Sequence, residues 1–128
     1  MPVTAVLVTS DGTRWLARCL AALLAQEPRP DRAVAVDTGR AEAGPALAGY
    51  PFDRICRLPP ATGFGAALAA GLAALDEAEP VGDEARSGDF VWVLHDDCAP
   101  APGALAALLA AADAPDIGIV GPKVLDWA

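Results

Sequence analysis

Short apolar runs alternate with helical patterns along the whole chain. Five runs have the length and the β-branched content that are typical of strands, and residues that favour turns follow them. These runs are Val3 to Thr9, Arg32 to Val36, Phe52 to Leu58, Phe90 to Leu94 and Ile117 to Val120. The fourth run has five consecutive apolar residues, which predicts a strand buried on both faces. Charged residues interrupt the third run, which predicts a strand near an edge of the sheet.

The segments between these runs favour helices. Leu16, Cys19, Leu20, Leu23 and Leu24 form one apolar stripe at three- and four-residue spacing, which predicts an amphipathic helix that ends before Pro28. Cys19 is then a small core residue rather than a reactive thiol. We expect the turn and the helix N-cap within 9–12, a weak helix or loop over 41–50, an alanine-rich helix over 66–75, an acidic surface loop over 76–89 and an amphipathic helix over 105–112.

Repeated strand–helix units predict an α/β fold, Rossmann-like, with a mostly parallel sheet and helices on both faces. Polar residues follow three of the predicted strands: Thr9 to Asp11, Asp37, and His95 to Asp97. Right-handed crossovers bring the carboxyl ends of parallel strands to one edge, where ligands of open α/β sheets bind. We therefore expect acids that are remote in the sequence to converge there.

The adjacent carboxylates of Asp96 and Asp97 suggest a place for a divalent cation or a polar substrate. A second interpretation stays open, in which the pair only turns the chain. Gly63 and Gly65 precede or open a predicted helix, so they could admit a ligand and offer N–H donors to an anion, or could simply pack a tight loop on the sheet. Their spacing is not the dinucleotide-binding fingerprint.

Length and charge narrow the possible functions. The 128 residues are enough for one domain, and the formal net charge of −8 argues against nonspecific binding to nucleic acid or to an anionic membrane. A phosphorylated ligand would need a metal or local donors to offset its repulsion by the negative charge of the protein.

The cysteines and the apolar runs indicate the compartment. Three cysteines in unrelated contexts predict no disulfide framework and a reducing compartment. We find no signal peptide and no membrane-spanning run, and we expect a cytoplasmic location, with membrane association open for a full-length protein.

Several segments in this order resemble the N-terminal, donor-binding half of a family 2 glycosyltransferase with the GT-A fold, and the resemblance covers nearly all of the chain. The segments are Thr-Ser-Asp at 9–11, Leu-Leu-Ala-Gln at 23–26, Val-Asp-Thr-Gly at 36–39, Gly-Phe-Gly-Ala-Ala at 63–67 followed by Gly-Leu at 71–72, Leu-His-Asp-Asp at 94–97 and Ile-Val-Gly-Pro-Lys-Val at 119–124. The resemblance implies that a sugar linked to UDP or dTDP is transferred from this nucleotide diphosphate to an acceptor hydroxyl. The transfer would invert the configuration of the sugar and would be assisted by a metal ion.

The resemblance also implies roles for individual residues. The donor-binding set would be Thr9, Asp11, Asp37, Gly63, Gly65 and Asp96, with Asp37 at the base or ribose and Asp96 at the sugar or ribose. Asp97 would bind Mg²⁺ or Mn²⁺, with His95 as a further candidate ligand. His95 stands where many members have an acid, which predicts weaker metal binding or a different geometry.

The acceptor half and the general base are expected beyond Ala128. Residues 1–128 would then be a single nucleotide-sugar-binding domain from a longer chain, able by itself to bind the donor but not to transfer the sugar.

Other functions stay open at this point. A non-catalytic nucleotide-binding or interaction domain is the main alternative, and a receiver-type domain that accepts phosphate at Asp37, with Lys123 nearby, is a weaker one. A zinc site at His95 and Cys98 lacks paired ligand spacing, and a serine hydrolase lacks its Gly-x-Ser-x-Gly motif. The oligomeric state is not predicted.

Overall fold

The computed structural model describes residues 2–11, 14–41, 43–78 and 89–127. In these residues four parallel strands form one sheet in the order β3-β2-β1-β4. The strands are β1 (Val3–Thr9), β2 (Arg32–Asp37), β3 (Arg54–Arg57) and β4 (Phe90–His95). The helices are α1 (Leu16–Leu24), α2 (Gly44–Leu47), α3 (Phe64–Ala78) and α5 (Ala104–Ala111). The predicted α/β, Rossmann-like fold is confirmed, and this strand order differs from the 2-1-3-4-5 order of receiver-type domains.

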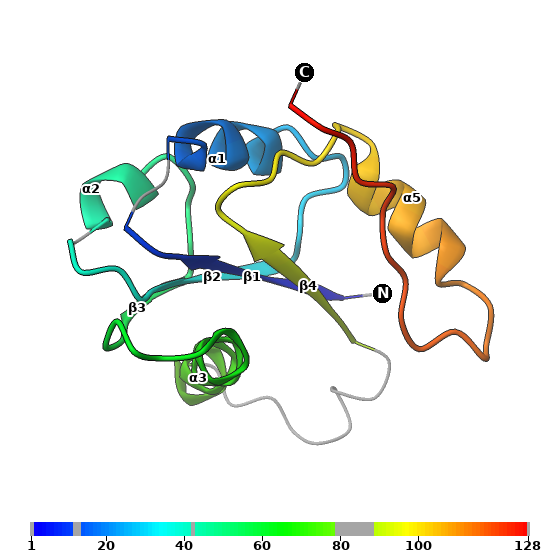
Figure 1. Cartoon of the computed structure of the whole chain (residues 1–128). Coiled ribbons are helices and arrows are strands. Elements are labelled where there is room, and N and C mark those ends of the chain that lie inside the picture. Colours follow the sequence, from blue (N-terminus) through cyan, green and yellow to red (C-terminus); the bar gives the residue numbers. More distant parts are fainter. Residues whose placement is uncertain (1, 12–13, 42, 79–88, 128) are drawn as a thin grey trace.

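Helices cover both faces of the sheet (Figure 1). Alternate side chains of β1 point to opposite faces, so Ala5 and Leu7 join the core cluster that contains residues of α1 and α2, whereas Val6 and Val8 join the cluster beneath α3. Every residue of β1 is consequently buried. The central strand thus has two apolar faces because each face meets a helix layer.

Close packing of α3 on the sheet depends on Gly71. A Cβ atom built on Gly71 would lie 2.8 Å from the Cγ2 atom of Val36, closer than real side chains approach. Without a side chain at this position, the helix backbone lies directly over the valines of β2. This contact fixes the height of α3 above the sheet, and with it the position of the helix N-terminus near the carboxyl ends of the strands.

Strand β4 lies at an edge of the sheet, and the prediction that it is buried on both faces is wrong. Val91 and Val93 are 45% and 43% exposed. The reason is that α3, the described helix on that side of the sheet, packs on β1, β2 and β3 rather than over β4. The prediction for the third strand is confirmed, because β3 occupies the opposite edge.

The predicted strand at Ile117 to Val120 is wrong as well. Residues 117–127 have no regular secondary structure, and Ile119 is 94% exposed. A strand is stable only when a neighbour completes its hydrogen bonds, and this segment runs alongside α5 and β4 without joining the described sheet (Figure 1). Stacking of Trp127 on Trp15, with ring centroids 4.3 Å apart, holds the end of the segment against the start of α1.

The predicted helix boundaries need smaller corrections. The N-cap of helix α1 is Trp15, whose side chain makes no capping hydrogen bond, so the N-cap expected within 9–12 is wrong. Helix α3 extends to Ala78, beyond the predicted end at 75, and α2 is a single turn within the weak pattern at 41–50. Most of the predicted acidic loop, at 79–88, lies outside the described residues.

Candidate functional site at the carboxyl edge of the sheet

The polar residues at the carboxyl ends of β1, β2 and β4 meet in one row. Thr9 pairs with Asp37 in the register of β1 and β2, and Val8 pairs with His95 in the register of β1 and β4, which places Asp96 beside Thr9. The hydroxyl of Thr9 donates a hydrogen bond of 2.7 Å to Oδ2 of Asp96. The predicted convergence of these strand ends is therefore present.

Asp96, the first acid of the pair, is fully buried. Its Oδ2 accepts hydrogen bonds from the Thr9 hydroxyl and, at 3.2 Å, from the backbone N–H of Ser10. Its Oδ1 lies 3.0 Å from Nδ1 of His95. Asp96 consequently connects the ends of β1 and β4, and its side chain is fixed before any ligand arrives.

Asp97, the second acid, is on the surface. Its side chain is 60% exposed, and its Oδ1 lies 3.2 Å from the same Nδ1 atom of His95. One ligand atom from each of His95, Asp96 and Asp97 lies within 4.8 Å of the others. Two carboxylate oxygens and an imidazole nitrogen suit a first-row divalent cation such as Mn²⁺, and the oxygens also suit Mg²⁺. The donor set therefore fits a divalent metal ion.

The glycine-containing loop lies beside this cluster. Phe64, the first residue of α3, stacks on His95 with ring centroids 5.8 Å apart. The first backbone hydrogen bond of the helix runs from the N–H of Ala67 to the carbonyl of Gly63. No atom lies within 4 Å of a Cβ built on Gly63 or Gly65, so tight packing of these glycines on the sheet is not their role. The space around both glycines is open.

Asp37 is buried and strongly bonded within the chain. Its Oδ1 accepts a hydrogen bond from the N–H of Gly39, and its Oδ2 accepts bonds from the N–H of Ala43 at 2.9 Å and from Nη1 of Arg57 at 2.8 Å. These contacts hold the loop after β2 and attach it to β3. A contact between Asp37 and a nucleotide stays a prediction.

Asp11 connects the turns that follow β1 and β2. Its backbone has a φ of 59°, and its Oδ1 accepts a hydrogen bond of 2.6 Å from the N–H of Arg40. A Cβ atom built on Gly39 would lie 2.3 Å from the backbone nitrogen of Asp11. Glycine at 39 is therefore required by the close approach of the two turns.

Gln26, for which the sequence predicted no role, is buried and positions the loop after β4. Its side-chain amide nitrogen donates to the carbonyl of Ala101 at 2.8 Å, and its amide oxygen accepts a hydrogen bond from the N–H of Leu105. Gln26 thus joins the end of α1 to the start of α5. The available signal was a polar residue directly after the apolar stripe of α1, in the Leu-Leu-Ala-Gln segment. Arg57, the partner of Asp37, was also given no role, because in the sequence it is only one of the charged residues that interrupt the third predicted strand.

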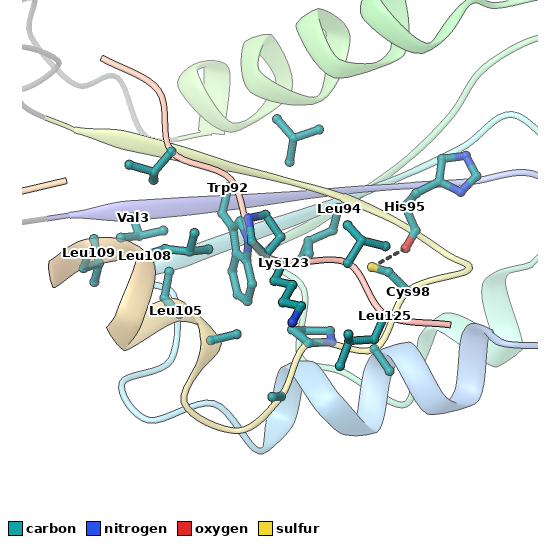
Figure 2. A pocket seen from close by; sticks show the side chains of 18 of the residues that line it. Val3, Trp92, Leu94, His95, Cys98, Leu105, Leu108, Leu109, Lys123 and Leu125 are labelled. Atoms are coloured by element: carbon teal, nitrogen blue, oxygen red, sulfur yellow. Dashed lines mark hydrogen bonds between the residues drawn. The ribbon is translucent and has the colours of Figure 1, made fainter. Parts of the chain in front are cut away.

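Two thiols meet behind the acidic cluster, as the sequence did not predict. Sγ of Cys98 lies 2.9 Å and Sγ of Cys19 lies 3.7 Å from the carbonyl oxygen of His95, and Figure 2 shows the shorter of these hydrogen bonds. The hydrogen bond between the two thiols lowers the pKa of Cys98 to about 7. That bond and burial both raise the pKa of Cys19. The prediction that Cys19 is a core residue is confirmed, since it is fully buried.

A cavity of about 1140 Å³ lies between β4, α5 and the C-terminal segment. Trp92, Leu94 and Leu105 give it an apolar wall, and Lys123 points into it from the C-terminal segment (Figure 2). One end of the cavity reaches His95, Asp97 and Cys98. An apolar cavity therefore adjoins the acidic cluster on the β4 side.

A parallel sheet in the order β3-β2-β1-β4, with acids at its carboxyl edge, defines a Rossmann-like α/β protein whose candidate site lies where such sheets bind ligands. Residues 2–128 match the model of the family described as glycosyltransferase like family 2, and the chain belongs to this family. Comparisons with curated proteins and with solved structures found no match. Among the described residues, no helix has both the length and the apolar character needed to span a bilayer.

Proposed function

We propose that the carboxyl edge of the sheet binds a nucleotide diphosphate sugar together with Mg²⁺ or Mn²⁺, for inverting transfer of the sugar to an acceptor hydroxyl. The observation that carries the proposal is the joining of Thr9, Asp96, His95 and Asp97 in one cluster beside the N-terminus of α3. Membership of the glycosyltransferase family supports the reaction class.

Charge explains why a cation belongs in this proposal. The chain has a formal net charge of −8, and Asp96 and Asp97 add local negative charge at the place where a diphosphate would bind. A divalent cation held there would neutralise the charge that develops on the leaving diphosphate. Asp97 and Asp96 would be its carboxylate ligands, with His95 as a further ligand once its Nδ1 turns from the carboxylates to the ion.

The start of α3 is proposed to contact the phosphates. The N–H groups in the first turn of a helix have no partner within the helix, and they carry the positive end of its dipole. Open space at Gly63 and Gly65 lets a ligand approach the backbone here. The helix would thus supply N–H donors beside the two acids.

The remaining residues of the proposed donor site would act mainly by holding other groups in place. Thr9 orients Asp96 through its 2.7 Å hydrogen bond, and Asp96 would contact the sugar or ribose in addition to the ion. Asp11 and Asp37 hold the turns after β1 and β2 that would face the nucleotide. Asp37 would contact the base or ribose through an oxygen lone pair that its hydrogen-bond partners within the chain leave open.

The test is calorimetric titration of the protein with UDP and with dTDP, each with and without Mn²⁺. We expect Mn²⁺ to strengthen binding to the wild type and to have little effect on Asp97→Ala. Loss of a residue that only orients a metal ligand typically weakens metal affinity by about 10- to 100-fold, and loss of the ligand itself should weaken it at least as much. Without Mn²⁺ the variant should bind no more weakly than the wild type, because a repulsive charge has been removed.

The matched control is Asp113→Ala. Asp113 is exposed and follows the far end of α5, so this change removes the same charge away from the acidic cluster. The control should retain the wild-type response to Mn²⁺. Equal metal-dependent binding by the wild type and Asp97→Ala would overturn the assignment of the metal ligand, and absence of binding to either nucleotide would overturn the donor site.

A further inference from the structure

The thiols of Cys19 and Cys98 come from distant parts of the chain and meet at one atom. Cys19 lies on α1 and Cys98 follows β4, yet both sulfurs lie within 3.7 Å of the carbonyl oxygen of His95. Cys98 also packs against the core cluster that contains Cys19. A shared acceptor this close places the two sulfurs where a small movement of the loop after β4 would bring them to bonding distance.

The two thiols differ in access to solvent, and this difference gives each a role. Cys19 is fully buried, whereas Cys98 is only partly buried and can meet a small oxidant. Cys56, the third cysteine, packs against the core cluster on the α3 face of the sheet. It is therefore separated by the sheet from Cys19, which belongs to the cluster on the α1 face, and it serves as an internal control.

We propose that Cys19 and Cys98 are a redox-active pair that forms an intramolecular disulfide when the protein meets a peroxide. This modification site goes beyond the proposed transfer reaction and does not depend on it. In a reducing compartment such a bond would be transient, as is typical of redox-responsive cysteines.

The chemistry balances with hydrogen peroxide as the two-electron oxidant. The sulfur of Cys98 attacks one peroxide oxygen, the O–O bond breaks, and sulfenic acid and one water form. The sulfur of Cys19 then attacks the sulfur of Cys98, and the hydroxyl group leaves as a second water with the Cys19 proton. Two thiols are oxidised to one disulfide, and one peroxide is reduced to two waters.

The disulfide would act on the neighbouring site through the backbone. Cys98 directly follows Asp97, and residues 96–97 form the turn after β4. A bond from Cys98 to Cys19 would tie this turn to α1 and draw the Cys98 sulfur away from the His95 carbonyl. The oxidation state of the pair would therefore set the position of the Asp97 carboxylate.

The experiment treats the full chain with hydrogen peroxide and counts free thiols, with peptide mapping by mass spectrometry. We expect free thiols to fall from three to one, a Cys19–Cys98 cross-linked peptide with a mass lower by two hydrogens, and full recovery with dithiothreitol. Cys56→Ala should form the same cross-link. Cys98→Ser should leave Cys19 as a free thiol under the same treatment, with its fold checked by circular dichroism.

Other products would overturn the proposal. These are a sulfinic acid at Cys98 with Cys19 still free, or disulfides made only between molecules through Cys56. If Cys98→Ser does not fold, the wild-type peptide map decides the question alone, because it identifies the partner of each sulfur.

Discussion

Asp37 ends β2 and Asp97 lies just after β4 at the same edge of the sheet, yet their surroundings are opposite. Asp37 is 2% exposed and accepts hydrogen bonds from two backbone N–H groups and an arginine. The side chain of Asp97 is 60% exposed, and its Oδ1 lies 3.2 Å from Nδ1 of the half-exposed His95 ring. A carboxylate that the chain already satisfies holds structure, whereas an exposed carboxylate beside a buried one is available to a ligand.

The largest expected effect is a difference in protein stability between alanine variants of these two acids. Asp37→Ala leaves Arg57 and two buried N–H groups without their acceptor, and it should lower the free energy of unfolding by about 3 kcal/mol, at the low end for a broken buried charge pair. The low end applies because the Arg57 side chain is 44% exposed, which screens its charge. Asp97→Ala should change the free energy of unfolding by less than about 0.5 kcal/mol. Urea denaturation of both variants measures the difference, and equal losses would remove the distinction between the two acids.

A pair of glycine variants sharpens the same comparison between a packed and an open part of the edge. Gly39→Ala places a methyl group 2.3 Å from the Asp11 nitrogen and should cost about 2 kcal/mol of unfolding free energy, because backbone must move. Gly65→Ala meets open space in the first turn of α3 and should stabilise the protein by about 0.5 kcal/mol through helix propensity. Thermal unfolding compares the two variants, and a destabilised Gly65→Ala would mean that this region is packed.

The smallest effect concerns the thiol next to Asp97. The hydrogen bond with Cys19 lowers the pKa of Cys98 from 9.0 to about 7, although burial of the thiol acts in the opposite direction. Since iodoacetamide reacts with the thiolate, labelling of Cys98 should accelerate as the pH rises through about 7 and level off above it. Cys19→Ala should move this midpoint back up toward 9.0. A midpoint near 9.0 in the wild type would show that the two thiols do not interact.

Much of the fold and the general location of the site could be predicted from the sequence. Apolar runs fixed β1 and β2, the three- and four-residue spacing of leucines fixed α1, and the strand–helix alternation fixed a parallel sheet. Parallel strands end at one edge, so the meeting of Thr9, Asp37 and Asp96 followed from topology. These features depend on local pattern and on chain connectivity, which the sequence contains.

Only the tertiary structure decided which acid is buried, where the strands stop and which side chains touch. The segment at 117–120 has the composition of a strand but pairs with no strand among the described residues, and β4 is apolar although its Val91 and Val93 are partly exposed. The roles of Arg57 and Gln26 and the meeting of Cys19 with Cys98 join residues 20 to 79 positions apart. Such contacts depend on how layers pack in space, and the order of residues along the chain does not specify them.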